Sequence, residues 1–349
     1  MTSTRGTGVR LGPVGVRLRR RPVLAATVVG AAVVAITLAG LLTGALALPV
    51  DRVLAALAGQ GTSVEALVVD RRLTRVLAAL VVGAALGCSG ALTQTITRNP
   101  IASPDILGVV SGASAAAVWL AVRPESAEVL GVPAHSAYGP AAIGGGFAAA
   151  ALILALSWRA GFDGYRVVLV GIGVNALALA VVSWLLTRAD LQQAAVATRW
   201  LAGSLDGVRR EDLITAVAVL PALVVSLVLA DRLGALRLGR DVAMSLGVRT
   251  ARTEAVALLL SVLLASVATA VAGPVAFVAF VAPQAAMRLF GTAGPPPLAG
   301  AITGALLLLV ADSTTQALPV PLPVGIITSI VGAPFLLYLM IRSLRRRSA

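Results

Sequence analysis

The sequence predicts an all-α membrane protein with ten transmembrane helices per subunit. Composition is the first reason: of 349 residues, 58% are hydrophobic and 12% are charged, and the mean hydropathy is +0.95. Soluble domains carry about 25% charged residues. The second reason is that ten apolar runs of nearly bilayer-spanning length follow one another along the chain. The third is the presence of arginines at both ends, which favours an even number of crossings.

Each predicted helix is an apolar run that charged residues, glycine or proline separate from the next one. A membrane helix needs about 20 residues. The first run is longer than the roughly 7–15-residue core of a cleaved signal peptide, so we expect it to remain as a helix. The eighth run is short, and Gly273-Pro274 is expected to make the turn before it. In order, the runs cover residues 23–48, 73–96, 106–122, 140–158, 165–187, 212–230, 255–272, 275–290, 298–316 and 324–342.

Charge asymmetry sets the predicted orientation. Residues 1–22 form an arginine-rich tail, residues 23–342 the ten-helix transmembrane domain, and residues 343–349 a second basic tail. Short basic segments stay in the cytoplasm, so both tails are predicted there. Nine crossings would place the three arginines at 345–347 outside the cell. The same topology explains the net charge of +13 without a nucleic-acid partner.

The order of the predicted helices divides the domain into two halves. Helices two to five start outside and helices seven to ten start inside, which is the pattern of an inverted repeat in transporters. Between the halves, the inside loop 231–254 carries short amphipathic pieces interrupted at Gly239 and Gly247. We expect two small helices there, lying beside the membrane.

The second run and the segment after it mix apolar residues with Gly, Ser, Thr, Gln and Asn over residues 72–112. Small residues let helices approach closely in lipid, and polar residues line interfaces or wet cavities. We therefore expect this segment to form the wall of a membrane pathway. Glycine pairs spaced four residues apart predict tight helix packing at Gly40/Gly44, Gly83/Gly87, Gly108/Gly112 and Gly300/Gly304.

Asp312 and Asn175 are polar residues inside predicted helices. A carboxylate within a bilayer is costly and is therefore a functional candidate. Asp312 is predicted near the outer end of the ninth run, where water reaches it, and both a hydrogen-bonding role and a direct transport role stay open. At the inner end of the second run, Asn99-Pro100-Ile101 begins a segment whose prolines stop both flanking helices. That segment predicts either an ordinary loop or a constriction at the cytoplasmic mouth.

Catalytic chemistry has little support in the sequence. All 28 basic residues are arginine, so the chain lacks the lysine of a P-loop. Gly-Cys-Ser-Gly at 87–90 matches the pattern around an intramembrane serine nucleophile, but the single histidine, His135, is predicted in an outside loop. With one cysteine and no His/Cys cluster, we expect no resident metal or cofactor and no enzyme.

Arg71, Arg72 and Arg75 cluster at the outer start of the second run, against the positive-inside trend. Two interpretations stay open. Their long side chains could reach the membrane interface from within the helix. Alternatively, they could dock an acidic partner from outside, where arginine–carboxylate pairs would fix the register.

Five stretches in colinear order resemble the FecCD/BtuC-type permeases of ABC importers for iron–siderophores, haem and cobalamin. The resemblance extends from about Arg72 to the C-terminus. The stretches are RLTRVLAALVVGAALGCSGALTQ from residue 72 with RNPIASPDILGVVSGA from residue 98, LGRDVAMSLGV at 238–248, AGPVAFVAFVAPQ at 272–284, LLLLVAD at 306–312 and LPVGIITSIVGAPFLLYL at 322–339.

The resemblance implies a BtuC-like type II importer fold, with two permease subunits, identical or paralogous, around a central pathway. It also implies two ATP-binding subunits inside, which bind the ATP, and a substrate-binding protein outside. Arg72 and Arg75 match arginines that meet glutamates on the binding protein, and Gln316 stands where many members carry another docking arginine. Asn99-Pro100-Ile101 matches the cytoplasmic gate. The residues that match the ATPase-coupling helices are Gly239, Arg240, Asp241, Ser245, Leu246 and Gly247.

The form Ala-Pro-Gln at 282–284 and the glutamine at 316 resemble the ferric-siderophore branch, near the ferric enterobactin permeases. The expected cargo is therefore an iron(III)–siderophore complex that crosses the membrane as an intact chelate. A permease of the same kind for cobalamin or haem is the first alternative. An ion-gradient-driven secondary transporter is the second, but it would need intramembrane carboxylates or histidines for coupling.

Overall fold

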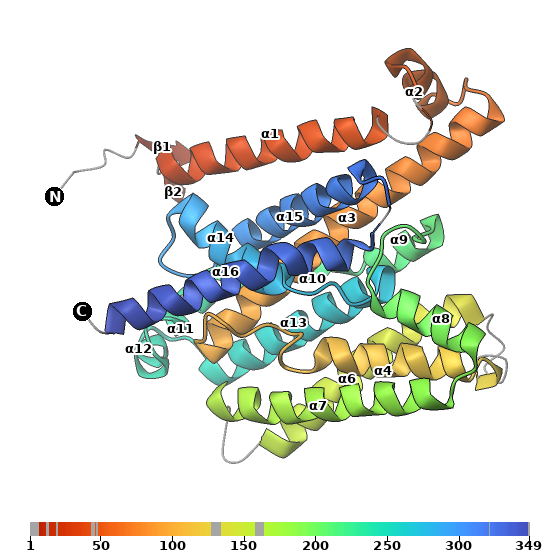
Figure 1. Ribbon diagram of the computed structural model, residues 1–349. Helices are drawn as coiled ribbons and strands as arrows, with labels where there is room; N and C mark the ends of the chain where they lie inside the picture. Colours follow the sequence, from red (N-terminus) through yellow and green to blue (C-terminus); the bar gives the residue numbers. More distant parts are fainter. Residues whose placement is uncertain are drawn as a thin grey trace.

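The computed structural model describes residues 7–11, 14–18, 20–42, 46, 48–126, 134–157, 164–320 and 322–347. Within these ranges helices dominate, and one short antiparallel hairpin precedes the first of them (Figure 1). Gly44 and parts of both predicted tails lie outside the described residues.

The hairpin pairs β1 (Thr7–Leu11) with β2 (Val14–Leu18). The long helices form the body of the molecule. They are α1 (Arg20–Leu42), α3 (Ser63–Thr97), α6 (Ala134–Ser157), α7 (Gly164–Arg188), α13 (Thr250–Ala272), α15 (Pro297–Ala317) and α16 (Val324–Arg347). The shorter helices are α2 (Val50–Leu57), α4 (Val109–Val122), α8 (Leu191–Leu201), α9 (Arg210–Ala216), α10 (Val219–Val228), α11 (Ala230–Leu236), α12 (Arg240–Ser245) and α14 (Val278–Phe290).

Eight helical stretches in the described part of the chain are long and apolar enough to cross a membrane, and α9 and α10 together form one of them. The apolar helices α4 and α14 are shorter. These ten stretches occupy the positions of the ten predicted runs. The all-helical membrane architecture is thus confirmed, while ten crossings remain a prediction.

The outer start of α3 differs from the prediction: the helix begins at Ser63 rather than at residue 73. A capping box explains this start, because the Thr62 hydroxyl accepts from the Glu65 N–H and the Glu65 carboxylate accepts from the Thr62 N–H at 2.8 Å. The polar residues that follow therefore do not end the helix. With 35 residues, α3 is longer than a membrane span requires.

The predicted tails also contain regular structure. The pieces TGVRL and VGVRL alternate apolar residues with glycine and arginine, which is the two-residue period of strands. At the other end, α16 continues to Arg347, so much of the predicted C-terminal tail is helical. The hairpin, the end of α16 and the helices α11 and α12 all lie at one end of the molecule, and α2 and α8 lie at the other (Figure 1).

Helix α3 is the central helix, and α13, α14 and α15 pack around it. In its most apolar 18-residue stretch, 78% of the residues are buried. All residues from 85 to 96 are buried within the subunit. The expectation that the whole segment 72–112 lines a pathway is therefore wrong for this part of α3, because its polar side chains form hydrogen bonds between packed helices.

Glycines set the closest helix contacts, as the four-residue spacing predicted. A Cβ atom on Gly83 or Gly87 would collide with backbone carbonyls of the facing pair Gly300/Gly304, so α3 and α15 touch backbone to backbone. Gly112 on α4 faces Gly145 on α6 in the same way. Backbone contact of this kind is how helices associate in lipid, where no hydrophobic force drives them together.

Candidate functional site

An ion-pair cluster joins α3 to the C-terminal part of α15. Arg75 on α3 donates from Nε to both carboxylate oxygens of Asp312 at 3.0 Å. Gln316, one turn further along α15, donates to the same carboxylate at 2.8 Å. The Asp312 side chain is 2% exposed. The expectation that water reaches Asp312 is wrong, and the pairing favours its hydrogen-bonding role.

Asp206 completes the cluster from the loop after α8, where it forms a short ion pair with the Arg75 guanidinium. The start of its loop is held to α13 and α16: the Ser204 N–H donates to Ala272 O at 2.8 Å, and the Gly325 N–H donates to Gly203 O at 3.1 Å. The Asp206 side chain is 70% exposed. Nothing in the sequence distinguishes Asp206 from the other acidic residues of the predicted outer loops.

Arg72 lies one turn before Arg75 but has different partners. It donates to the carbonyl oxygens of Leu41 at 2.9 Å and Leu42 at 3.4 Å, and also to Leu46 O. The last carbonyls of a helix have no intrahelical partner, so Arg72 satisfies the end of α1. The three predicted docking residues therefore separate: Arg75 and Gln316 share one cluster, and Arg72 supports α1.

A cavity of about 810 Å³ adjoins this cluster at the same end of the molecule. Its volume lies within the roughly 300–1,000 Å³ of small-molecule sites. The lining combines charges of both signs with aromatic side chains, namely Arg75, Arg199, Arg209, Asp206, Glu211, Asp212, Tyr138 and Trp200.

The predicted gate residues form a tight turn after α3. Arg98 ends the helix in the left-handed conformation, with φ of 50°. The Asn99 carboxamide oxygen then accepts from the Ile101 N–H at 3.0 Å, and Ala102 N–H donates to Asn99 O at 3.2 Å. Ile101 is 37% exposed. The turn therefore presents one apolar side chain from a constrained backbone.

Asp105 is a candidate that the sequence analysis missed. Its carboxyl lies beside the backbone N–H of Phe277. Phe277, at the start of α14, has φ of 66°, an uncommon conformation for a bulky residue. Asp105 therefore connects the segment after the gate to α14. The sequence feature that could have identified Asp105 is its charge, because it is the single charged residue between positions 99 and 122.

Asn175 lies elsewhere, on α7. Its backbone packs against Gly108 at the start of α4, where a Cβ atom on Gly108 would lie 3.0 Å from Asn175 N. Asn175 and Asp312 therefore belong to different helix contacts, although both lie within helices long enough to span a membrane.

The loop 231–254 contains the two small helices that the sequence predicted, α11 and α12. Gly239 precedes α12 with φ of 117° and Gly247 follows it with φ of 79°, so both interruptions need glycine. Arg240 lies 3.2 Å from Glu254 at the start of α13, which holds α12 against the helix bundle. The Ser245 hydroxyl donates to Val242 O at 2.8 Å.

Four apolar side chains on this helix pair are exposed: Leu238, Val242, Met244 and Leu246. Asp241 lies among them and is also exposed. A concentrated exposed apolar patch with a polar rim is typical of a protein interaction surface.

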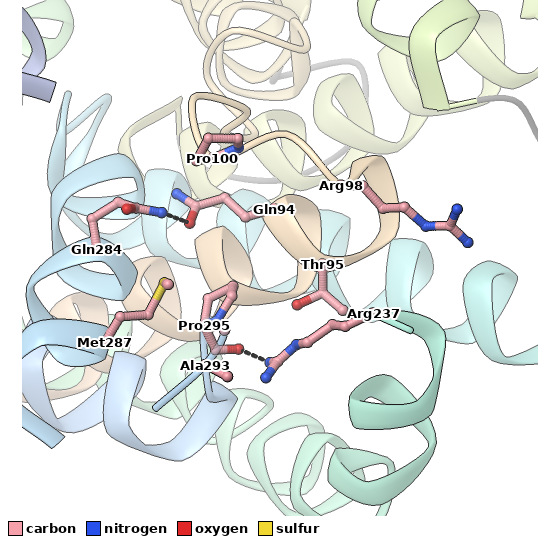
Figure 2. A pocket seen from close by; sticks show the side chains of 10 residues that line it. Gln94, Thr95, Arg98, Pro100, Arg237, Gln284, Met287, Ala293 and Pro295 are labelled. Atoms are coloured by element: carbon pink, nitrogen blue, oxygen red, sulfur yellow. Dashed lines mark hydrogen bonds between the residues drawn. The ribbon is translucent and has the colours of Figure 1, made fainter. Parts of the chain in front are cut away.

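A smaller cavity of about 220 Å³ lies between the end of α3, α11 and the loop 291–296 (Figure 2). Its floor contains Gln94 and Gln284, whose carboxamides share a hydrogen bond of 2.8 Å. Arg237 points toward Ala293 and Pro295 and donates to Pro295 O, whereas Arg98 points away from them (Figure 2). Burial lowers the pKa of the Arg237 guanidinium from its ordinary value.

Ser89 has a packing role. Its hydroxyl is 0% exposed and donates to Ser261 O at 2.7 Å, and Thr93 bonds the Ser261 hydroxyl at 2.6 Å. These contacts join α3 to α13 in the core. His135 falls in the first turn of α6 rather than in a loop. Among the described residues, no group of three or more His, Cys, Asp or Glu side chains is placed to hold a metal ion.

The comparison with known families decides the identification. The model of the FecCD transport family matches residues 22–342. The chain belongs to the FecCD transport family.

Relatives within the FecCD family are similar over nearly the whole chain. The ferric enterobactin transport system permease protein FepG of Escherichia coli is 40% identical over 88% of this chain and 92% of its own length. The achromobactin transport system permease protein CbrC of Dickeya dadantii is 41% identical over 89% of each chain. The hemin transport system permease protein HmuU of Yersinia pestis is 37% identical over 79% of this chain and 84% of its own length.

The fold is also similar to a solved structure described as a metal-chelate type ABC transporter in an inward-facing conformation. The TM-score is 0.77 at 26% sequence identity, with 92% of this chain and 99% of that chain covered. The FecCD assignment and the three-dimensional similarity therefore agree.

Proposed function

We propose that this chain is the membrane-spanning permease subunit of an ATP-driven ABC importer that moves an iron(III)–siderophore complex into the cytoplasm. The observation that carries the proposal is the similarity to siderophore permeases over nearly the whole chain, including 40% identity to the ferric enterobactin permease protein. Because the chain has no P-loop lysine, ATP is bound and hydrolysed by separate subunits. This chain contributes a conformational change to transport, and the ATPase subunits carry out the chemical reaction.

The cargo travels as a chelate. The described part of the chain offers no cluster of ligands for bare iron, and a large chelate needs a wide, weakly polar path rather than fixed metal ligands. That path forms between this subunit and a second, identical or paralogous one. Exposed apolar side chains on α7, α10 and α16, such as Leu177, Val224 and Ile330, face this partner or the lipid bilayer.

All ten apolar helices cross the membrane, including the short α4 and α14. Short helices suit segments whose ends lie within protein rather than at the membrane surface. Because β1–β2 and the end of α16 lie at the same end of the molecule (Figure 1), an even number of crossings fits the arrangement. The basic tails make that end cytoplasmic.

Three surfaces then have separate tasks. At the outer end, Arg72, Arg75 and Gln316 face the side on which a substrate-binding protein docks. At the inner end, the turn Asn99-Pro100-Ile101 closes the cytoplasmic gate. The coupling helices α11 and α12 present their exposed apolar patch to the ATP-binding subunits, where rigid shape transmits closure.

A permease of the same kind for haem is the second candidate, because the hemin permease relative is 37% identical. The ion-driven alternative is less well supported. Its coupling group would be Asp312, and this carboxylate is already paired with Arg75 and Gln316. A buried carboxylate whose oxygens already have two partners within the protein offers little room to bind and release an ion.

Uptake by cells that lack the gene tests the substrate. Cells carrying the wild-type gene should accumulate labelled ferric siderophore, and deletion should abolish that uptake. Labelled haem and cobalamin form the control arms. Unchanged siderophore uptake after deletion would refute the siderophore assignment, and loss of haem uptake alone would favour the second candidate. Failure to co-purify with an ATP-binding subunit would favour the ion-driven alternative.

A further inference from the structure

Helix α14 contacts, at its two ends, two segments that are expected to move in the proposed transport cycle: the end of α11 and the segment after the gate. Its C-terminal end leads into the loop 291–296, which lies against Arg237 at the end of α11. Its N-terminal end begins at Phe277, beside Asp105 in the segment that follows the gate. The helix is short, with 13 residues, and buried along most of its length.

The cytoplasmic joint is closely packed. Arg237 donates to Pro295 O, and its guanidinium lies on the backbone of Gly294 (Figure 2). A Cβ atom at position 294 would lie 2.7–2.8 Å from Cδ, Nε and Nη1 of Arg237, so a larger residue there would displace the Arg237 side chain. Within the loop, the Thr292 N–H donates to Met287 O at 3.2 Å, and its hydroxyl donates to Gly294 O at 2.9 Å. These contacts connect the end of α11 to α14 through the loop 291–296.

The opposite joint is also constrained. The left-handed Phe277 cannot relax freely, because its ring fills the space beside Gly332 on α16, where any Cβ atom would overlap it. The first N–H groups of a helix need acceptors, and the Asp105 carboxyl lies beside the N–H of Phe277, the residue that precedes α14. The same carboxyl stands three residues before the glycine that starts α4. Asp105 thus ties α14 to the segment between gate and α4.

Between its ends, α14 is held along α3. Gly90 lies directly against the backbone of Ala279, and the Gln94 carboxamide donates to Phe280 O at 3.2 Å. Gln284 on α14 donates to the Gln94 oxygen at 2.8 Å. These contacts are buried and leave little freedom for α14 to bend or slide independently of α3.

We infer that α14 is the mechanical link between the ATPase-facing helices α11 and α12 and the gate, with Arg237 and Asp105 as the positioning residues that fasten its two ends. This inference rests on the proposed function. Nucleotide-driven closure moves α11, the Arg237 joint moves the loop 291–296, and α14 passes the displacement to the Asp105 joint. Coupling of this kind requires α14 to have two discrete packed positions, one for each state of the transporter, rather than to deform continuously.

The test uses the complete transporter in lipid vesicles, with a reporter that needs no knowledge of the cargo. Ile101→Cys, in a Cys88→Ser background, reports gate accessibility as a maleimide-labelling rate with and without ATP. Arg237→Gln and Asp105→Ala should each reduce the nucleotide-dependent change about tenfold, the order of a typical allosteric coupling, while ATP hydrolysis continues. Arg166→Gln, an exposed arginine on α7, is the matched control and should respond normally.

Conservative variants distinguish the loss of a positioning contact from a general loss of folding. Asp105→Asn keeps an acceptor oxygen and Arg237→Lys keeps the charge, so both should recover part of the response. Gly294→Ala leaves Arg237 in place but displaces its guanidinium, and should reproduce the loss seen for Arg237→Gln. A normal response in either Arg237→Gln or Asp105→Ala would overturn the role of α14. Absence of any nucleotide response in the unsubstituted reporter would instead refute the ATPase partnership, and the role of α14 with it.

Discussion

At the residue scale, the Arg75–Asp312 pair is expected to be costly to disrupt, because it is buried between α3 and α15. Asp312 is nearly inaccessible to water, so its charge depends on Arg75 and Gln316 for compensation. Loss of Asp312 leaves Arg75 with the exposed Asp206 as its remaining acidic partner, and removing one member of a buried pair costs about 3–5 kcal/mol. We therefore expect Asp312→Ala to lower the unfolding temperature of the purified protein markedly. Asp206→Ala, at an exposed partner of the same arginine, should cost at most about 1 kcal/mol.

Equal unfolding temperatures for the two variants would contradict this ordering. Such a result would mean that water or lipid headgroups compensate Arg75 after the loss of Asp312. The comparison is informative because both variants remove a carboxylate from the same guanidinium, and the difference between them is burial.

Docking of the binding protein is a second residue-scale prediction. Reversing Arg72 or Arg75 to Glu should weaken the complex about tenfold, or ~1.4 kcal/mol, because acidic groups on the partner would then meet like charge. Titration of the purified partner against the transporter at low and high salt measures the effect. Arg71→Glu, an exposed neighbour, shows how much arises from net charge alone. Unchanged affinity at low salt for both variants would exclude these arginines from the interface.

At the element scale, the contact between α3 and α15 depends on the absence of side chains. Gly87→Ala forces a methyl group against the Gly300 carbonyl, and overpacking of this kind costs about 1–3 kcal/mol. Gly173→Ala, at a helical position with open space around it, should be neutral or slightly stabilising, since alanine is the better helix former. Thermal unfolding of both variants in detergent tests the difference, and equal stability would show that the helices can separate without cost.

The coupling pair α11–α12 depends on backbone conformation more than on space. Gly247 has open surroundings, but its φ of 79° is strained for any other residue, by about 1–2 kcal/mol. Gly247→Leu should reshape the surface that meets the ATPase and reduce transport per ATP hydrolysed, with membrane insertion intact. Gly30→Leu, on α1 in open space and without a positive φ, is the control. Wild-type transport in Gly247→Leu would argue against the coupling role.

At the scale of the whole molecule, the sequence predicts the positions of the membrane-spanning stretches because each one contains an apolar run. The position of α12 also follows from sequence, since Gly239 and Gly247 bound it. By contrast, the partners of α3 could not be predicted. The polar residues 85–96 looked suited to a wet pathway, but which face is buried depends on contacts made more than 160 positions away.

The same limitation explains the charged cluster. Arg75, Gln316 and Asp312 were all predicted candidates, yet neither spacing nor composition could indicate that they share one site, because α3 and α15 meet only in the folded bundle. No sequence feature marked Asp206 as a member of this cluster. Long-range ion pairs in this chain depend on which helices pack together, and a single sequence does not show which helices do so.

Membrane topology is the last prediction. With ten crossings, α8 lies outside and α12 inside, so reporter cysteines at their exposed Leu191 and Leu246 should report opposite compartments. In the Cys88→Ser background, a membrane-impermeant maleimide should label Leu191→Cys in intact cells, or in spheroplasts if there is an outer membrane. It should label Leu246→Cys in inverted vesicles alone. Labelling of both positions from one side would mean an even number of crossings between Leu191 and Leu246, against the single crossing expected for α9 and α10. It would also remove the basis for placing the basic tails, the gate and the coupling helices together in the cytoplasm.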